Sequence, residues 1–259
     1  MEWQIIHIDE TDSTNRWLKE HLGENRPLCV EKNRPLCVVA DYQTAGRGCG
    51  SNTWESERGK NLTFSLLIHP ENLPANRQFA ISEWVSVALC ETLEHYLSPL
   101  ASHHSPLTSH LSPLIKWPND IYWRDSKLAG ILIENTLKGN LVKDSIIGIG
   151  LNVNQREFHS DAPNPVSLWQ ITGQETNREQ LLQDILQAFA PQKGAKGSDP
   201  CAPRYAQMLY RREGYHRYAD KDGEFMAEMM GVEPDGHLLL RDDSGQERRY
   251  AFKEVTFII

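Results

Sequence analysis

Residues 41–68 read DYQTAGRGCGSNTWESERGKNLTFSLLI and join a glycine-rich polar segment to an apolar strand. Every second residue from Leu62 to Ile68 is apolar, so these side chains share one face of the expected strand. Another strand-like run, at residues 36–40, precedes the polar segment. Because connections between buried strands are usually short, the long connection over residues 41–60 predicts a functional loop.

The glycines of this loop indicate what it binds. Gly46, Gly48 and Gly50 alternate with other residues, and alternate glycines let backbone N–H groups approach an anion closely. The guanidinium of Arg47 adds a planar positive group. The loop therefore predicts an anion site, and a mobile surface loop without a ligand is the alternative that these residues leave open.

Other motifs are arranged around the loop in a definite order. STN at residues 13–15 comes before AGRG at 45–48, and KWPND at 116–120, KLAGIL at 127–132 and GIGLNVN at 148–154 follow. Together these motifs resemble the biotin protein ligase (biotin–[acetyl-CoA-carboxylase] ligase) family. The resemblance is to the monofunctional type, which lacks an N-terminal DNA-binding domain.

The resemblance implies an α+β fold with two domains. Residues 1–213 are expected to form a mixed-sheet catalytic domain of the biotin/lipoate protein ligase type, which is similar to class II aminoacyl-tRNA synthetases. Residues 214–259 are expected to form a small SH3-like β-barrel. Hairpin signals at residues 234–236 and 243–245, between short apolar runs, favour the same β structure.

Local signals predict most of the remaining elements. Asp12 or Ser13 is expected to cap one helix, and Thr176 with Glu179 forms a capping-box pattern ahead of another. Apolar spacing predicts helices at residues 76–97 and 204–212, and strands at residues 5–8, 115–117, 121–123, 128–134 and 145–153. Residues 190–203 have linker composition.

Two repeats are expected to be surface connections. NRPLCV occurs at residues 25–30 and again at 33–38, and the first copy is expected to bulge out of the fold. SPL occurs three times within residues 98–114, which predicts a flexible loop because proline recurs in each unit. Its histidines, His103, His104 and His110, lack carboxylate or thiol partners, so a metal site is not expected there.

Composition bounds the class of protein. The chain has 259 residues, of which 39% are hydrophobic and 24% charged, and its net charge of −8 disfavours non-specific nucleic-acid binding. Five cysteines without CxxC spacing indicate reduced thiols in the cytoplasm. No apolar run is long enough to span a membrane, and no secretory signal pattern opens the sequence.

The resemblance also implies a two-step reaction. Biotin's carboxylate attacks the α-phosphorus of ATP to give biotinyl-5′-adenylate and diphosphate, and a lysine of a biotin carboxyl carrier protein then takes the biotinyl group. Mg-ATP and biotin are the implied substrates, with Mg²⁺ accompanying the nucleotide. Since two anions must meet, positioning and cationic stabilisation matter more than a covalent nucleophile.

Site residues are carried over from the matching motifs. The implied catalytic residues are Lys127, Arg47 and Asp120, and Asp120 is also the candidate Mg²⁺ ligand. The implied biotin-binding residues are Ser13, Thr14, Asn15, Gln43, Gly46, Arg47, Gly48, Cys49 and Lys127. The implied ATP-binding residues are Trp54, Lys116, Asn119 and Asn152. From its own position, Asp120 has two further roles open to it: ordering the lysines, or capping the turn of KWPND.

Cys49 departs from the family pattern, which often has Arg or Gln at this position. A thiol makes weaker hydrogen bonds than either, so we expect this chain to retain its adenylate less firmly. Residues 44–60 are the expected lid, and they are expected to be mobile without ligand.

Other functions remain open at this point. A lipoate or octanoate ligase shares the superfamily fold, and a non-catalytic biotin-binding protein would fit a decayed site. A DNA-binding repressor is the least expected function. A carboxylase carrier domain is the implied partner, and an exposed sheet edge would allow a homodimer.

Overall fold

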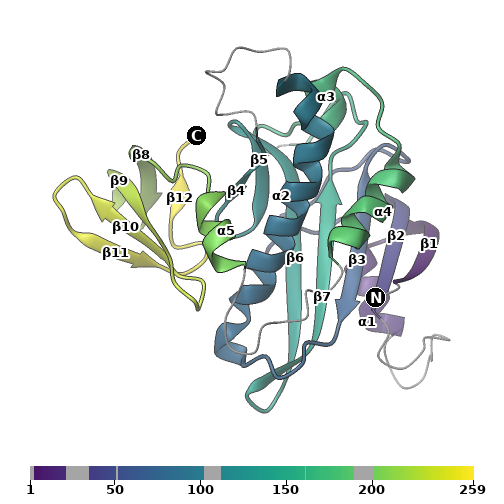
Figure 1. Ribbon diagram of the computed structural model, residues 1–259, viewed down its shortest axis with the longest axis horizontal. Coiled ribbons are helices and arrows are strands. Elements are labelled where there is room, and N and C mark those ends of the chain that lie inside the picture. Colours follow the sequence, from purple (N-terminus) through teal and green to yellow (C-terminus); the bar gives the residue numbers. More distant parts are fainter. Residues whose placement is uncertain (1–2, 22–34, 51, 102–111, 161, 190–200) are drawn as a thin grey trace.

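The computed structural model describes residues 3–21, 35–50, 52–101, 112–160, 162–189 and 201–259 (Figure 1). Its largest element is a seven-stranded mixed sheet, which confirms the predicted α+β class. β1 and β2 are parallel, whereas the other neighbouring strands are antiparallel. In spatial order the strands are β1 (Gln4–Thr11), β2 (Leu36–Gln43), β3 (Leu62–Ile68), β7 (Leu141–Leu151), β6 (Ser126–Lys138), β5 (Asp120–Trp123) and β4 (Leu114–Lys116).

Both faces of β3 are buried, which makes this strand the centre of the core. Phe64 and Leu66 pack into the larger hydrophobic cluster together with α2, as their period-two spacing predicts. Leu67 points to the opposite face and packs with Leu18 of α1. Figure 1 shows α2 and α4 lying across one face of the sheet. The helices of the described residues are α1 (Thr14–His21), η1 (Ala75–Arg77), α2 (Phe79–Ala101), α3 (Leu168–Thr172), α4 (Arg178–Ala188) and α5 (Ala202–Gln207).

The C-terminal part of the chain forms a separate five-stranded sheet, consistent with an SH3-like domain. Both predicted hairpin turns are present, at residues 234–236 and 243–245. In the second turn, the Asp242 carboxylate accepts hydrogen bonds from the Ser244 hydroxyl at 2.6 Å and the Gln246 N–H at 2.9 Å. In spatial order the strands are β11 (Glu247–Tyr250), β10 (Leu238–Asp242), β9 (Gly223–Val232), β8 (Tyr215–Asp220) and β12 (Thr256–Phe257).

Trp117 joins the two sheets. Its indole Nε1 donates to the carbonyl of Gly236 at 3.0 Å, and its ring meets Phe252 edge-on with centroids 6.0 Å apart. Gly236 lies in the left-handed region, with φ of 94°, and a Cβ atom there would lie 2.7 Å from the ring of Phe79. Only glycine therefore allows this turn to approach the large sheet so closely.

Two predicted helix boundaries are wrong. Residues 98–101, expected to be loop, continue α2. Pro99 has no N–H for the carbonyl of His95, and the Ser98 hydroxyl donates to that carbonyl at 3.0 Å instead. The helix expected at residues 204–212 is α5, which ends at Gln207 because the following residues pair with β4.

The predicted capping box at the start of α4 is also wrong. Asn177, not Thr176, is the N-cap, and its side chain accepts a hydrogen bond from the Gln180 N–H. The N–H and carbonyl of Thr176 instead bond to the Asn154 side chain, both at 2.9 Å. A tertiary contact therefore moves the cap by one residue.

Some predictions lie outside the described residues. These are the first NRPLCV copy, the SPL segment at residues 102–111 with its histidines, and the linker at residues 190–200. Within the described part of the chain, no helix is both long enough and apolar enough to cross a bilayer.

Candidate functional site

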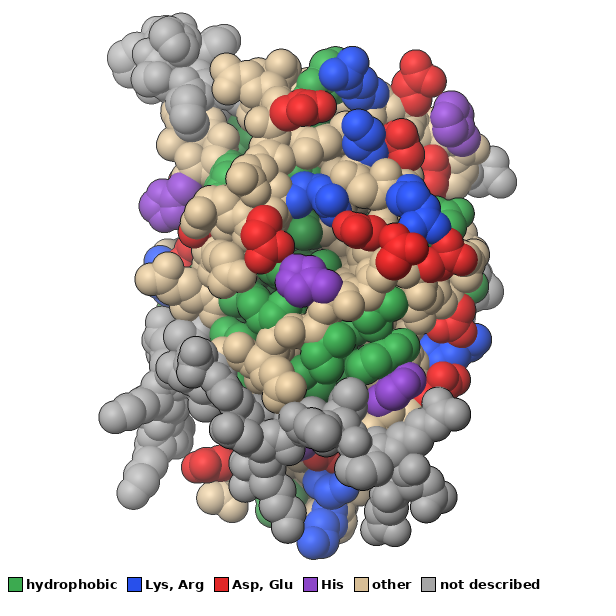
Figure 2. Space-filling view, turned by 90° about the vertical axis from the view of Figure 1, so that its right-hand side faces the viewer, with side chains coloured by type: hydrophobic (Ala, Val, Ile, Leu, Met, Phe, Trp, Pro, Cys, Tyr) green, Lys and Arg blue, Asp and Glu red, His purple; other side chains and the backbone are tan. Residues whose placement is uncertain are grey.

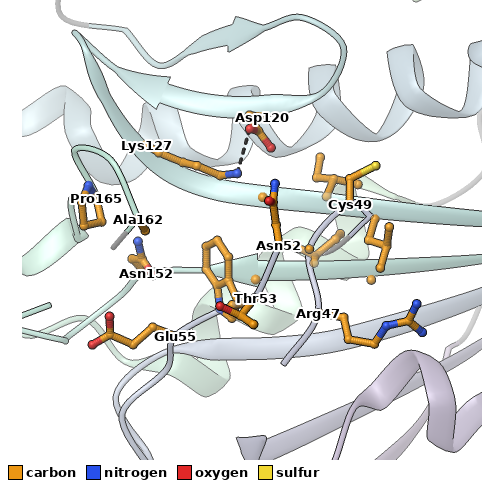
Figure 3. A pocket seen from close by; sticks show the side chains of 18 of the residues that line it. Arg47, Cys49, Asn52, Thr53, Glu55, Asp120, Lys127, Asn152, Ala162 and Pro165 are labelled. Atoms are coloured by element: carbon orange, nitrogen blue, oxygen red, sulfur yellow. Dashed lines mark hydrogen bonds and ion pairs between the residues drawn. The ribbon is translucent and has the colours of Figure 1, made fainter. Parts of the chain in front are cut away.

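A cavity of about 700 Å³ opens where the large sheet, the glycine loop and the KWPND turn meet (Figure 3). The structure brings together nearly all of the residues that the sequence predicted for the site. Of these, the cavity is lined by Ser13, Thr14, Asn15, Gln43, Arg47, Gly48, Cys49, Trp54, Lys116, Asn119, Asp120, Lys127 and Asn152. Gly46 does not line the cavity but is buried within the loop.

The glycine loop is folded back on itself as a short hairpin. The Gly48 N–H donates to the Asn52 carbonyl at 2.8 Å, and the Trp54 N–H donates to the Gly46 carbonyl at 2.9 Å. A Cβ atom at Gly46 would lie 2.5 Å from the Trp54 carbonyl oxygen. Close packing within the hairpin therefore explains why residue 46 is glycine. The Gly48 N–H, which was expected to approach an anion, already donates a hydrogen bond within the loop.

The indole of Trp54 lies on a floor made by two glycines. Gly130 of β6 and Gly150 of β7 are paired across the sheet. A Cβ atom at Gly150 would lie 2.3 Å from Trp54 Cε2, and one at Gly130 would lie 3.1 Å from Cζ3. Both strands therefore need glycine to seat the indole. The Trp54 Nε1 atom is buried and has no hydrogen-bond partner among the described residues.

One end of the cavity is a network of neutral polar groups at the start of α1. The carbonyl oxygen of the Gln43 side chain accepts hydrogen bonds from the Thr14 N–H at 2.8 Å and the Thr14 hydroxyl at 3.1 Å. Ser65 of β3 places its hydroxyl 2.6 Å from both Thr14 Oγ1 and Asn15 Oδ1. Gly148 makes room for the amide, since a Cβ atom there would lie 2.4 Å from Asn15 Oδ1.

Glu134 anchors this network from behind. The Asn15 amide donates to one carboxylate oxygen at 2.8 Å, and the Lys19 ammonium lies 2.7 Å from the other. Burial acts to raise the pKa of Glu134, but the hydrogen bonds from Lys19 and Asn15 and the charge of Arg47 outweigh it. The net result is a lowered pKa, so the carboxylate stays ionised in this partly buried position.

The other end of the cavity carries charge. Lys127, near the start of β6, places its Nζ atom 2.7 Å from Asp120 Oδ2, the pair that is joined by a dashed line in Figure 3. The backbone of Lys127 is fixed as well, because its N–H donates to the Asn164 carbonyl and its own carbonyl accepts from the Val166 N–H. The ammonium also lies 5.9 Å from the centroid of the Trp54 ring.

Lys116 is the last residue of β4, and Trp117 follows it in the turn. The Lys116 ammonium lies over the ring of Tyr122 at 5.3 Å and that of Phe257 at 5.0 Å. Burial lowers its pKa; the Asp120 carboxylate opposes that effect, and the charge of Lys127 adds to it. Lys116 thus contributes a second cation beside the Lys127–Asp120 pair.

Arg47 and Asn152 occupy different parts of the cavity wall. Arg47 is exposed, forms no ion pair with a described residue, and points away from Lys127 in Figure 3. Both residues line the cavity, but their charged groups lie apart. Asn152 is buried, and its amide donates to the Val166 carbonyl at 3.1 Å. Its side-chain oxygen has no partner among the residues that the structure describes.

Comparison with known proteins identifies the family. Residues 8–152 match the model of the biotin/lipoate A/B protein ligase family. The chain belongs to this family. It is 30% identical to the bifunctional ligase/repressor BirA of Salmonella typhimurium, over 90% of this chain and 68% of that protein. It is 28% identical to the biotin–[acetyl-CoA-carboxylase] ligase of Paracoccus denitrificans, over 93% and 95% of the two chains.

A solved structure of the same family agrees with the fold. The biotin protein ligase from Aquifex aeolicus in complex with biotin and ATP superimposes with a TM-score of 0.72. The two chains are 25% identical, and the match covers 98% of this chain and 97% of the other. The match extends across both sheets, so the family resemblance includes the C-terminal domain.

Several residues of this ligase-family site were missed by reasoning from the sequence, and four of them have a clear structural part in it. Ser65 and Glu134 support the neutral end, Gly130 forms half of the floor, and Phe252 lines the cavity from the C-terminal domain. Ser65 had a local signal, since it is a polar residue within an apolar strand. For Phe252 no local signal exists, because only the docking of the second sheet brings it to the cavity.

Proposed function

We propose that this chain is an ATP-dependent biotin–protein ligase. It activates biotin as biotinyl-5′-adenylate and transfers the biotinyl group to a lysine of a biotin carboxyl carrier protein. The observation that carries the proposal is the layout of the cavity, which has a neutral hydrogen-bonding network at one end and the Lys127–Asp120 pair at the other. Biotin has a matching layout, with a neutral ring urea at one end and a carboxylate at the other.

The neutral end suits the ring urea. The Gln43 side-chain oxygen is already engaged by Thr14, which leaves the Gln43 amide N–H groups as donors for a carbonyl oxygen. Ser13, Thr14 and Asn15 are all less than 5% exposed, so their dipoles are held in place before the ligand arrives. A neutral ligand group exchanges water for these dipoles without the cost of desolvating an ion.

The charged end suits the first step of the reaction. A carboxylate oxygen of biotin forms a bond to the α-phosphorus while the bond to diphosphate breaks, and the departing oxygen takes the electron pair. Two anions repel each other in this step, and the ammonium of Lys127 would lower that repulsion. Because its pairing with Asp120 is partly exposed, Lys127 exchanges one carboxylate for another at little cost.

The glycine loop and Trp54 serve the second step. The amine of the carrier lysine attacks the carboxyl carbon of the adenylate, loses a proton, and displaces AMP. Water would compete with the amine, so a cover over the cavity is required between the steps. We propose that residues 44–60 form this cover, and their mobility in the free protein stays a prediction.

The donor set fits Mg²⁺ that arrives with ATP. Mg²⁺ commonly takes one or two carboxylates and completes its coordination with phosphate oxygens and water. Asp120 provides such a carboxylate beside Lys127. When bound, the ion would neutralise phosphate charge, and Asp120 would then exchange its contact with Lys127 for one with the ion.

We also propose where the partner docks. At the β4 edge of the sheet, the N–H and carbonyl of Ile115 are paired with residues 208 and 210. The β1 edge, by contrast, has no strand beside it in the described part of the chain. An extended segment of the carrier, or β1 of a second copy in a homodimer, would pair at this edge.

Three further parts of the proposal concern domains, nucleic acid and compartment. Residues 1–213 would form the catalytic domain and residues 214–259 the C-terminal domain. Acidic and basic side chains intermingle on the face that carries β1 (Figure 2), and the net charge is −8, so a nucleic-acid partner is not proposed. Cys37, Cys49 and Cys90 carry free thiols, which agrees with the cytoplasm.

The test combines the protein with biotin, Mg-ATP and a carrier domain, followed by intact mass measurement of the carrier. We expect diphosphate release only when biotin and ATP are both present, and one added biotinyl group on the carrier. Free lipoate or octanoate in excess should not reduce the yield. Diphosphate release with lipoate but not with biotin would replace this proposal by the lipoate alternative.

A further inference from the structure

A turn of the C-terminal domain reaches the glycine loop of the catalytic domain. The turn, Ala251–Glu254, connects β11 to β12 and is closed by two hydrogen bonds. The Glu254 N–H donates to the Ala251 carbonyl at 3.1 Å, and the Ala251 N–H donates to the Glu254 carboxylate at 2.7 Å. Phe252, at the second position of the turn, lines the cavity.

Lys253, the third residue of this turn, has an unfavourable backbone conformation. Its φ is 75°, in the left-handed region that favours glycine. A non-glycine residue persists in such a conformation where the surrounding structure or a function requires it. The lysine side chain is therefore expected to make a contact that glycine could not make.

The ammonium group of Lys253 makes such a contact. Lys253 Nζ lies 3.5 Å from the carbonyl oxygen of Cys49, at the tip of the glycine loop. It also lies 2.2 Å from the position that a Cβ atom at Gly50 would occupy. Gly50 itself has a φ of 70°, a backbone conformation that favours glycine, and no side chain stands between its backbone and the ammonium. The ammonium of Lys253 therefore lies against the backbone at the tip of the loop.

The turn is held in place by the same segment that carries the catalytic aspartate. Trp117 fixes the C-terminal sheet through its hydrogen bond to Gly236 and its contact with Phe252. Asp120 lies three residues further along this segment. Movement of the glycine loop away from the cavity would therefore break the Lys253 contact, whereas the turn itself would stay where Trp117 holds it.

We propose that Lys253 is a positioning residue, which holds the glycine loop over the cavity while the activated acid is bound. The inference rests on the proposed function, because the acid to be protected is the adenylate formed there. Cys49 contributes its backbone carbonyl to this contact, and its neutral thiol contributes no charge. The cation that secures the tip of the loop comes instead from the C-terminal domain.

Hydrogen exchange in the free protein tests the contact independently of catalysis. We expect Lys253→Met to speed exchange of the Gly48 and Trp54 amides about two- to tenfold, the effect of losing one such hydrogen bond. Lys253→Arg should restore the slower exchange. Lys221→Met, which removes an exposed lysine of the same domain, should leave it unchanged. Equal exchange in Lys253→Met and the unsubstituted protein would overturn the proposal.

Lys253→Gly separates the ammonium contact from general destabilisation. Glycine relieves the left-handed backbone, so this variant should unfold at the same or a higher temperature than the unsubstituted protein. Its loop amides should nevertheless exchange as fast as those of Lys253→Met. Slow exchange in Lys253→Gly would show that the lysine side chain does not hold the loop, and would overturn the proposal.

Release of preformed adenylate then tests the consequence. We expect Lys253→Met to release it faster by about the same two- to tenfold factor. Faster loop exchange without faster release would overturn the protective role. Failure of the unsubstituted protein to form any adenylate would refute the proposed function instead, while the exchange measurements would still decide whether Lys253 holds the loop.

Discussion

The neutral end of the cavity is part of the protein core, whereas the charged end is half open to solvent. Thr14 and Asn15 are each 3% exposed and Ser65 is fully buried, and the Ser65 hydroxyl lies within hydrogen-bond distance of both of the others. The side chains of Lys127 and Asp120 are 29% and 27% exposed. A rigid ring can be recognised by groups that the fold holds in place. A reaction that redistributes charge requires groups that are free to change partners.

This difference predicts that the two ends respond to mutation in different ways. Substitutions at the neutral end should cost both stability and affinity, because the same hydrogen bonds provide both. Substitutions at the charged end should cost reaction rate with little effect on stability, because a partly exposed ion pair contributes roughly 0–1 kcal/mol to folding.

The largest expected effect is that of Lys127→Ala. Removing a preorganised group that stabilises developing charge typically lowers a rate about 10²- to 10³-fold. We therefore expect biotinylation of a carrier, followed by intact mass over time, to slow by this factor while the melting temperature changes little. Lys143→Ala removes a comparable strand lysine paired with Asp144 and should have no effect. A carrier modified at the original speed by Lys127→Ala would place the cationic centre elsewhere.

Ser65→Ala should have the next largest effect. It removes the hydrogen bond to the buried Asn15 Oδ1 and leaves Thr14 Oγ1 with Gln43 as its partner, which should lower the free energy of unfolding by about 1–3 kcal/mol. The Kd for biotin should rise about tenfold, measured by calorimetry. Ser145→Ala is the matched control, since Ser145 is also fully buried but its hydroxyl has no partner among the described residues. Equal stability losses in the two variants would mean that the network does not hold the start of α1.

Cys49→Arg should have a smaller effect, confined to the loop. A charge-assisted hydrogen bond from the new guanidinium should slow release of the adenylate, by up to about tenfold. Cys49→Ser, which keeps a small neutral group, should release it at the original rate. If Cys49→Arg and the unsubstituted protein release the adenylate equally fast, the thiol does not weaken retention.

Glu134→Gln should have the smallest effect and should depend on pH. The pKa of Glu134 in the folded protein lies below its ordinary value of 4.5, so its ionised form stabilises the fold above that pH. This contribution is lost as pH falls through the lowered pKa. Urea unfolding should show a deficit of about 1 kcal/mol at pH 7 that disappears in acid. Glu20→Gln, on the exposed side of α1, should show none, and a deficit that persisted in acid would contradict the ionic explanation.

Much of the fold could be predicted because its signals are local. Alternation along β3, the start of α1 directly after Ser13 and the two glycine-containing hairpin turns each depend on neighbouring residues, and all are present in the structure. Where local prediction was wrong, a distant contact decided the outcome. The cap of α4 shifted to Asn177 because Asn154 engages Thr176, and α5 ended early because the next residues pair with β4.

The residues that form the site could be predicted for a related reason. Glycines, lysines and tryptophans in ordered motifs indicate which residues meet at a ligand, and nearly all of those residues line one cavity. Their present partners were not predictable. The positions of Trp54 on Gly150 and of Arg47 away from Lys127 depend on how the loop folds back over the sheet.

By itself, the sequence determined the strands, the glycine loop and the residue types that a cavity would need, because periodicity, turns and motifs act over short distances along the chain. Only the tertiary structure decided which groups support them. Ser65 meets Asn15 across 50 residues, and Lys253 meets Cys49 across 204. The first pair forms because α1 packs on the large sheet, and the second because the C-terminal sheet docks beside it. Neighbouring residues along the chain do not specify either geometry.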